Sequence, residues 1–177
     1  PRNIHTLKLN TSRAASVRDL VNLPPTITKI VMPRLVIESN DDIALLPRSL
    51  LSINFKMGSA VTPAGWCNFP PNITKIACID VTEEDISLLP RSLLKLRVKK
   101  EFKDPSSFAR LPPNLTLLDY DYEAKDSMLS HLPPYLRKLR LQHHSFTEEG
   151  FKQLPNSVIV IEVGSSSSST LRLVAAK

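Results

Sequence analysis

The sequence predicts an α/β repeat solenoid, an arc of about eight units that average 22 residues, each giving one short strand to a parallel sheet. Two observations predict it. A Leu-Pro or Phe-Pro pair recurs seven times, four times with a second proline directly after it, and these motifs contain 11 of the 15 prolines in the 177-residue chain. Four residues after the apolar member of each pair begins the pattern apolar-x-x-apolar-x-apolar, at steps of 20 to 23 residues. Self-similarity at a fixed period is typical of arrays in which each unit stacks on the next.

The apolar pattern defines three slots in each of eight units, the first of which lacks its upstream Leu-Pro pair. All 24 slot residues are apolar, and the units begin at Ile4, Ile27, Leu50, Ile73, Leu93, Leu115, Leu136 and Val158. The alternation at the end of the pattern is that of a strand with one buried face. Equivalent strands separated by a return segment stack in parallel, and the proline stands before the strand, where its missing amide is tolerated.

A fourth apolar slot lies three residues before each Leu-Pro pair. Its residues are Leu20, Ile43, Trp66, Ile86, Phe108, Leu129 and Phe151. Because a fixed apolar phase indicates packing, we expect the single tryptophan to be a core residue and not a platform for ligand stacking.

The return segments hold short helical turns in several units. Asp42, Thr82 and Thr147 stand in sequences that resemble capping boxes, and we expect a helical turn after each. The stretches 58–68 and 103–107 contain Pro63 and Pro105 and offer no helical pattern, so we expect them to be extended or turn-like.

The repeats divide the chain into a repeat domain over residues 1–164 and a tail over residues 165–177. The tail begins with five serines, which suits a serine-rich linker followed by a C-terminal tail or a degenerate cap. Neither end of the array carries an atypical capping unit, so end-to-end self-association is an expectation.

The recurring segment resembles the strand segment of leucine-rich repeat proteins, L-x-x-L-x-L, over roughly residues 1–164. Units such as Leu46-Pro47-Arg48-Ser49-Leu50 are similar to the L-P-x-x-L variety of FNIP-type repeats and of bacterial effectors. The resemblance implies an arc with a parallel sheet on the concave face and short helices or irregular segments on the convex face, and it implies protein binding through the concave face. The asparagine that usually follows the last strand leucine is absent, so the turns after the strands must satisfy their backbone groups differently.

The residues interleaved with the strand slots form three rows on the concave face, which we call the basic wall. Nine of these 24 positions are Lys or Arg, where an even spread of the 23 basic residues would put about three. The predicted binding residues are Lys75, Lys95, Arg97, Lys99, Lys138, Arg140, Asp119 and Asp121. Two interpretations stay open: Asp119 and Asp121 neutralise the cations as cross-strand pairs of Asp119 with Arg97 and Arg140, or the residual positive field attracts an acidic partner.

Catalysis finds little support in the sequence. Glycine-rich phosphate loops, nucleophile elbows and zinc-binding histidine motifs are absent, and four glycines leave few backbone cradles for a ligand. Two cysteines, Cys67 and Cys78, are too few for a disulfide scaffold or a four-ligand zinc site. We therefore expect no enzyme activity, no cofactor and no metal.

The functional expectation is a non-enzymatic protein-binding module or scaffold that recognises an acidic partner through the basic wall. A nucleic-acid-binding or other polyanion-binding repeat protein is the alternative, because the basic wall would suit a polyanion as well. The sequence shows no membrane span and no secretory signal, and a cytoplasmic protein is expected. A secreted effector or an extracellular protein stays an alternative, since sequons such as that at Asn72 are present.

Overall fold

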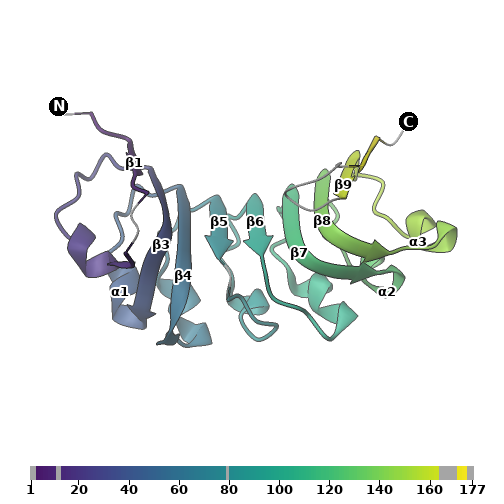
Figure 1. Cartoon of the computed structure of the whole chain (residues 1–177), viewed down its shortest axis with the longest axis horizontal. Coiled ribbons are helices and arrows are strands. Elements are labelled where there is room, and N and C mark those ends of the chain that lie inside the picture. The colour runs from purple at the N-terminus through teal and green to yellow at the C-terminus, as the bar shows by residue number, and fades with distance from the viewer. Residues whose placement is uncertain (1–2, 11–12, 79, 164–170, 175–177) are drawn as a thin grey trace.

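A single open sheet runs the length of the molecule. The computed structural model describes residues 3–10, 13–78, 80–163 and 171–174. The strands follow one another in chain order, and Figure 1 shows them as one row with the short helices along its lower side. The strands of the eight repeats pair in parallel and are β1 (Thr6–Lys8), β3 (Lys29–Ser39), β4 (Ser52–Ala60), β5 (Lys75–Cys78), β6 (Lys95–Val98), β7 (Leu117–Lys125), β8 (Lys138–Ser145) and β9 (Val160–Val163). The predicted repeat solenoid is confirmed.

Equivalent residues of neighbouring strands lie directly opposite one another. Lys75 pairs with Ser52 on one side and with Lys95 on the other, and the same register continues to the next strands. β3 and β4, like β7 and β8, pair again beyond a shift of register and are therefore longer than the four-residue β5 and β6. Each position of the repeat consequently becomes a row across the sheet.

Two short strands lie outside this scheme. β2 (Ala15–Ser16) pairs in parallel with the second half of β3, and β10 (Leu171–Val174) pairs antiparallel with β9. The predicted tail thus contributes one strand that the repeat pattern does not contain. Its serine run, 165–169, is outside the described residues.

The core is a column of apolar side chains behind the sheet. From Ile27 to Ile161 every described strand slot is buried, and Trp66, 1% exposed, stacks on Phe69 with 5.1 Å between ring centroids. The predicted core role of Trp66 is confirmed. The first unit differs from the expectation, because Ile4 and Leu9, which flank β1, are 39% and 41% exposed, and among the described strands β1 pairs only with β3.

The return segments form single turns of helix. Those of the α type are α1 (Asn40–Ala44), α2 (Asp126–Leu129) and α3 (Glu148–Lys152), and the 3-10 turns are η1 (Val17–Leu20), η2 (Pro63–Asn68), η3 (Ile86–Leu88) and η4 (Pro105–Arg110). The expectation of extended or turn-like chain holds for residues 58–60, which continue β4. It was wrong for residues 63–68 and 105–107, which lie in the 3-10 helices that begin at Pro63 and Pro105. A proline suits the first position of a helix, since its fixed φ is helical and its missing amide has no partner there.

Carboxylates inside the return segments replace the missing asparagine ladder in several units. Asp42 accepts hydrogen bonds from the amides of Glu38 and Ser39 at 3.0 and 3.1 Å, and Asp85 accepts from the amide of Thr82 at 2.7 Å. The Ser39 hydroxyl in turn accepts a hydrogen bond from the amide of Asp42, which makes a reciprocal capping box, whereas the Thr82 hydroxyl donates to Asp85. In both units the amide at the start of the turn is satisfied.

In the intervening units the cap comes from the preceding repeat. The amide of Thr62 donates to Asn40, that of Asp104 donates to Glu83, and that of Thr147 donates to Asp126, at 2.8 to 3.0 Å. Caps within a unit and caps between units therefore alternate along the stack and tie neighbouring turns together.

Glycine makes room for two of the caps between units. Gly65 and Gly150 occupy the position that Asp42 and Asp85 hold in their own repeats. A Cβ at Gly150 would clash with Oδ1 of Asp126, and a Cβ at Gly65 would clash with Oδ1 of Asn40. The absence of a side chain lets the neighbouring repeat supply the acceptor.

A tyrosine closes the turn after β6. The Tyr120 hydroxyl accepts a hydrogen bond from the amide of Phe102 at 2.9 Å, within a cluster that also contains Phe108. Burial raises the pKa of Tyr120 to about 12, despite the opposing effect of that hydrogen bond. The hydroxyl is thus held in its neutral form while it satisfies a buried amide.

Replacing Ile76 with Asp should unfold the array. Ile76 is fully buried on β5 in the middle of the sheet, so the change would bury an unpaired charge, at a cost of about 4 kcal/mol or more. Thermal unfolding followed by circular dichroism measures this effect. Asn54→Asp, on the accessible face of β4, is the control, and equal melting temperatures for the two variants would contradict the assigned faces.

The pairing of Gly150 with Asp126 should appear as coupling between two substitutions. Gly150→Ala should destabilise the wild-type chain by about 1 kcal/mol or more, because Asp126 must leave the Thr147 amide. In an Asp126→Ala background the same change should be nearly neutral. Chemical denaturation of the double-mutant cycle measures the coupling, and additive effects would refute the proposed exchange of caps.

The Asp42 cap should make stability sensitive to acid. Burial alone would raise the pKa of Asp42, but hydrogen bonds from Arg18 and from two backbone amides hold it below its usual value. A lowered folded pKa contributes stability above the unfolded pKa of about 4, and that stability is lost as the pH falls through the folded pKa.

Asp42→Asn should therefore lower the free energy of unfolding at pH 7 by roughly 1 to 3 kcal/mol. The gap between variant and wild type should narrow as the pH falls below about 4. Denaturant titrations at pH 7 and pH 3 check this. A gap of constant size would show that the charge of Asp42 has no role.

Candidate functional site: the basic wall

The in-register strands turn single basic residues into rows. The first row contains Lys29, Ser52, Lys75, Lys95, Leu117 and Lys138, one residue from each strand from β3 to β8. Arg97, Asp119, Arg140 and Glu162 follow one another in the second row. Because the residues between them are buried on the other side, these side chains share the accessible face of the sheet.

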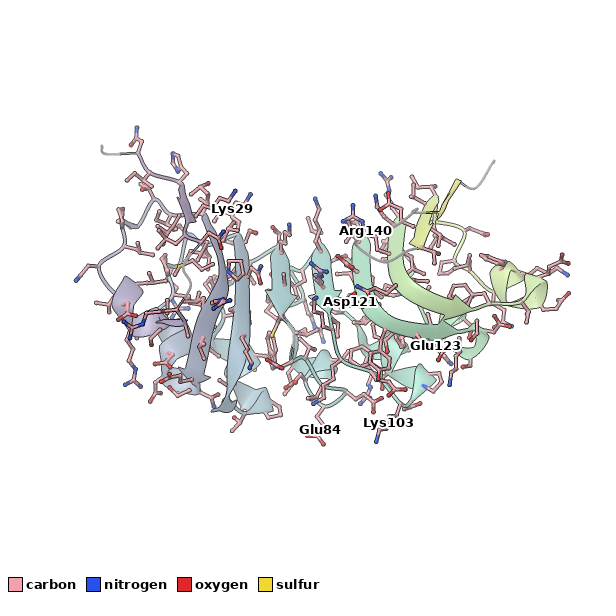
Figure 2. The ribbon with its side chains drawn as sticks, viewed as in Figure 1. Lys29, Glu84, Lys103, Asp121, Glu123 and Arg140 are labelled. Carbon is pink, nitrogen blue, oxygen red and sulfur yellow. The ribbon has the colours of Figure 1, made fainter. Side chains whose placement is uncertain are left out.

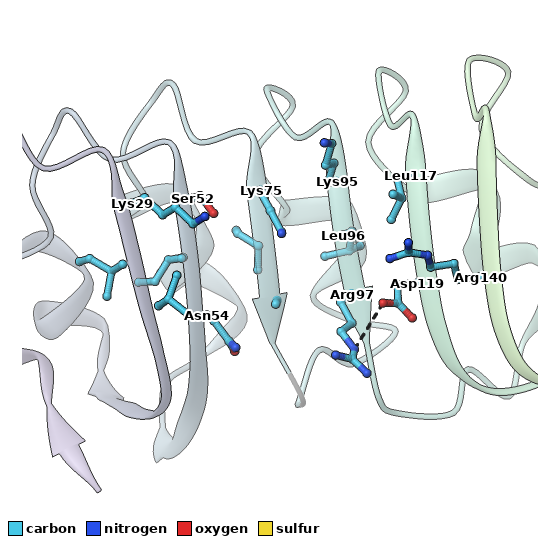
Figure 3. A pocket seen from close by; sticks show the side chains of 15 residues that line it. Lys29, Ser52, Asn54, Lys75, Lys95, Leu96, Arg97, Leu117, Asp119 and Arg140 are labelled. Carbon is cyan, nitrogen blue, oxygen red and sulfur yellow. Dashed lines mark ion pairs between the residues drawn. The ribbon is translucent and has the colours of Figure 1, made fainter. Parts of the chain in front are cut away.

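This face is hollowed over β3 to β7. A hollow of about 430 Å³ is lined by Lys29, Val31, Ser52, Asn54, Lys75, Ala77, Lys95, Arg97, Leu117, Asp119 and Arg140, together with the strand residues between them. Figure 3 shows Lys29 extending from β3 toward Ser52, and Arg97 turned toward Asp119. Ser52 and Asn54 on β4 and Ala77 on β5 are the short side chains of this lining, and Lys29, Lys75, Lys95 and Arg97 are the long ones.

The cations in the C-terminal part of the wall are largely neutralised by ion pairs within the wall. Arg97 lies 3.5 Å from both Asp119 and Asp121, and the Lys99 ammonium lies 2.7 Å from Asp121. Glu162 pairs with Lys138 at 2.5 Å and with Arg140 at 2.7 Å. Four cations thus share three carboxylates, and we call these seven residues the paired cluster.

The N-terminal part of the wall has no such neutralisation. Lys29, Lys75 and Lys95 are exposed, and none of them has an ion pair within the described ranges. Lys75 and Lys95 are direct neighbours on adjacent strands, where like charges repel. We call these three residues the lysine row.

Burial and pairing act differently on the carboxylates of the paired cluster. Burial raises the pKa of Asp119 above its usual value, against the attraction of Arg97 and Arg140. Hydrogen bonds from Lys138 and Arg140 lower the pKa of Glu162. Glu162 therefore stays ionised at neutral pH and holds both cations in place.

The structure brings the eight predicted site residues onto one face. Six of them belong to the paired cluster, and Lys75 and Lys95 belong to the lysine row. The expected pair of Arg97 with Asp119 is present, whereas Arg140 pairs with Glu162. Glu162 and Lys29 were missing from the predicted set. Both stand in the same repeat positions as predicted residues, Glu162 as Asp119 and Lys29 as Lys75, so repeat position is the signal that identifies them.

The described residues contain no cluster suited to a metal ion. No three His, Cys, Asp or Glu side chains gather there closely enough to hold one. Cys67 is exposed and Cys78 is buried in a strand slot. None of the helices in these ranges has the length and apolar content that a bilayer crossing requires.

Comparison with solved structures finds leucine-rich repeat proteins. The chain is similar to CroV588, a circular leucine-rich repeat protein, with a TM-score of 0.57 and 22% identity over 96% of the chain. It spans 28% of the length of that protein. The leucine-rich repeat-containing protein LegL7 from Legionella pneumophila aligns over 97% of the chain and 86% of its own, with 12% identity and a TM-score of 0.45.

Comparisons of sequence give no relative. No protein-family model matches the chain, and no curated protein matches it. The in-register parallel strands, the recurring apolar slots and the likeness to CroV588 agree with one another. The chain has the leucine-rich repeat fold.

Proposed function

We propose that the chain is a non-enzymatic protein-binding module that recognises an acidic surface of a partner through the basic wall. All eight residues predicted from the sequence belong to this wall. The paired cluster supplies shape and polar contacts, and the lysine row supplies net positive charge. The field of such a surface steers an acidic partner toward the hollow and excludes basic ones.

The lysine row is the observation that carries the proposal. Three exposed ammonium groups line one hollow without a carboxylate partner, and two of them are strand neighbours. This arrangement costs electrostatic energy in the free protein. A partner that brings carboxylates to the hollow relieves that cost, so binding energy is available there.

The lack of aromatic side chains in the hollow favours a protein partner over a nucleic acid. Single-stranded nucleic acids stack their bases on exposed aromatic rings. The exposed Tyr122 and Tyr135 do not line the hollow, and the residues that do line it include no aromatic ring.

Reversing the charge of the lysine row should weaken binding to acidic polypeptide. Lys29→Glu, Lys75→Glu and Lys95→Glu together should lower the affinity for poly-glutamate by about tenfold or more, measured by isothermal titration calorimetry. The melting temperature should hardly change, because none of these side chains is buried. Arg48→Glu, Arg91→Glu and Lys103→Glu make the same change in charge at exposed positions that do not line the hollow.

Two results would contradict the proposal. Equal losses of affinity for poly-glutamate in both triple variants would indicate a nonspecific effect of net charge. Tight binding of random oligonucleotides with a steep dependence on salt, at concentrations where poly-glutamate does not bind, would favour the nucleic-acid alternative.

A further inference from the structure

We propose that the lysine row recognises an extended peptide segment that carries acidic residues at alternate positions and crosses the wall from β3 to β6. This inference depends on the proposed function and specifies its ligand. It is argued from the spacing of the row, from the shape of the hollow and from the charges that border it.

The end-to-end span of the row matches that of three alternate residues in an extended chain. Adjacent strands are about 4.8 Å apart, so Lys29 and Lys95, three strands apart, are separated by roughly 14 Å at the backbone. In an extended peptide, side chains at i, i+2 and i+4 point the same way and span roughly 13 Å. Within the row, Lys75 is two strands from Lys29 and one strand from Lys95, roughly 10 and 5 Å, whereas alternate peptide residues are evenly spaced at roughly 7 Å. The outer two carboxylates therefore face Lys29 and Lys95, and the middle one lies within roughly 3 Å of the Lys75 position, a difference that a flexible lysine side chain can cover.

The hollow leaves room for a peptide backbone. Ser52 and Asn54 on β4 and Ala77 on β5 are short compared with the lysines around them, and all three line the hollow. Ser52 stands between Lys29 and Lys75 in the row and offers a hydroxyl at the wide gap between these two ammonium groups. Val31 and Ala77, both partly accessible, offer apolar contact to the stems of the ligand side chains.

The paired cluster limits the segment at β7. Leu117 takes the place of a lysine in the row on that strand, and Asp119 stands next to it in the second row. An acidic residue that extended beyond Lys95 would meet the side of the hollow that already holds a carboxylate. The register of the strands thus limits the length of the acidic segment and sets the spacing of its charges.

A comparison of isomeric peptides tests this inference. One peptide carries three glutamates separated by single glycines, and its isomer carries the same glutamates in one block. Fluorescence anisotropy with the full chain at low salt should show the alternating peptide binding about fivefold more tightly, because the block turns its middle carboxylate away from the wall.

Variants locate the binding. Lys29→Gln, Lys75→Gln and Lys95→Gln together should remove the preference and lower the affinity about tenfold. Arg48→Gln, Arg91→Gln and Lys103→Gln are the matched control and should change neither. Figure 2 shows Lys103 at the opposite edge of the molecule from Lys29.

The outcomes separate this inference from the proposed function. Equal affinities for the two isomers, both lost with the lysine row, would overturn the spacing and leave the acidic-partner function standing. Binding that survives loss of the row would overturn the location. Competition by inorganic phosphate at concentrations equal to those of the peptide would show a simple anion site and would overturn the peptide ligand.

Discussion

In-register parallel pairing of the repeat strands is the constraint on which the whole molecule depends. It converts each position of a 22-residue pattern into a row across the sheet. The apolar rows pack behind the sheet, and the rows between them become an accessible face. The same geometry that aligns core residues also places Lys75 beside Lys95 and Arg97 beside Asp119. Burial stabilises the first result by roughly 25 cal/mol for each Å² of apolar surface, whereas exposed charge pairs contribute less than about 1 kcal/mol each. Packing therefore sets the register, and the charges of the wall follow from it.

The caps of the helical turns behind the sheet follow a second pattern, which repeats every two units. From α1 to α3 the amide that opens each turn is bound alternately by a side chain of its own repeat and by one of the preceding repeat, as in Asp85 for Thr82 and Glu83 for Asp104. Because a cap between units needs neighbouring turns at a fixed distance, the caps reinforce the spacing that the sheet imposes. They do so without the asparagine ladder that usually fills this role. Backbone amides at the starts of these turns are thereby satisfied by side chains of several types, including the thioether of Met128, which lies 3.2 Å from the amide of Lys125.

Much of the fold could be predicted from the sequence, because apolar periodicity reports burial directly. The buried strand slots, the core position of Trp66 and the face of the sheet that carries the basic wall all follow from the position of each residue in the repeat. The helical turns at Pro63 and Pro105 could not be read that way, since proline marks both a turn and a first helical position. The division of the wall was also missed. Row membership predicts which residues are neighbours, but the choice of Glu162 over Asp119 by Arg140 depends on side-chain conformations that no spacing encodes.

The division of the wall into a paired cluster and a free lysine row is the central functional claim, and competitive chemical labelling of lysine amines tests it most directly. Trace acetylation of the native chain, with each site quantified by mass spectrometry, should modify Lys29, Lys75 and Lys95 faster than Lys99 and Lys138, whose ammonium groups are held by Asp121 and Glu162. Equal rates at all five lysines would contradict the account. They would mean that the carboxylates do not hold their partners and that no part of the wall is set apart for an acidic ligand.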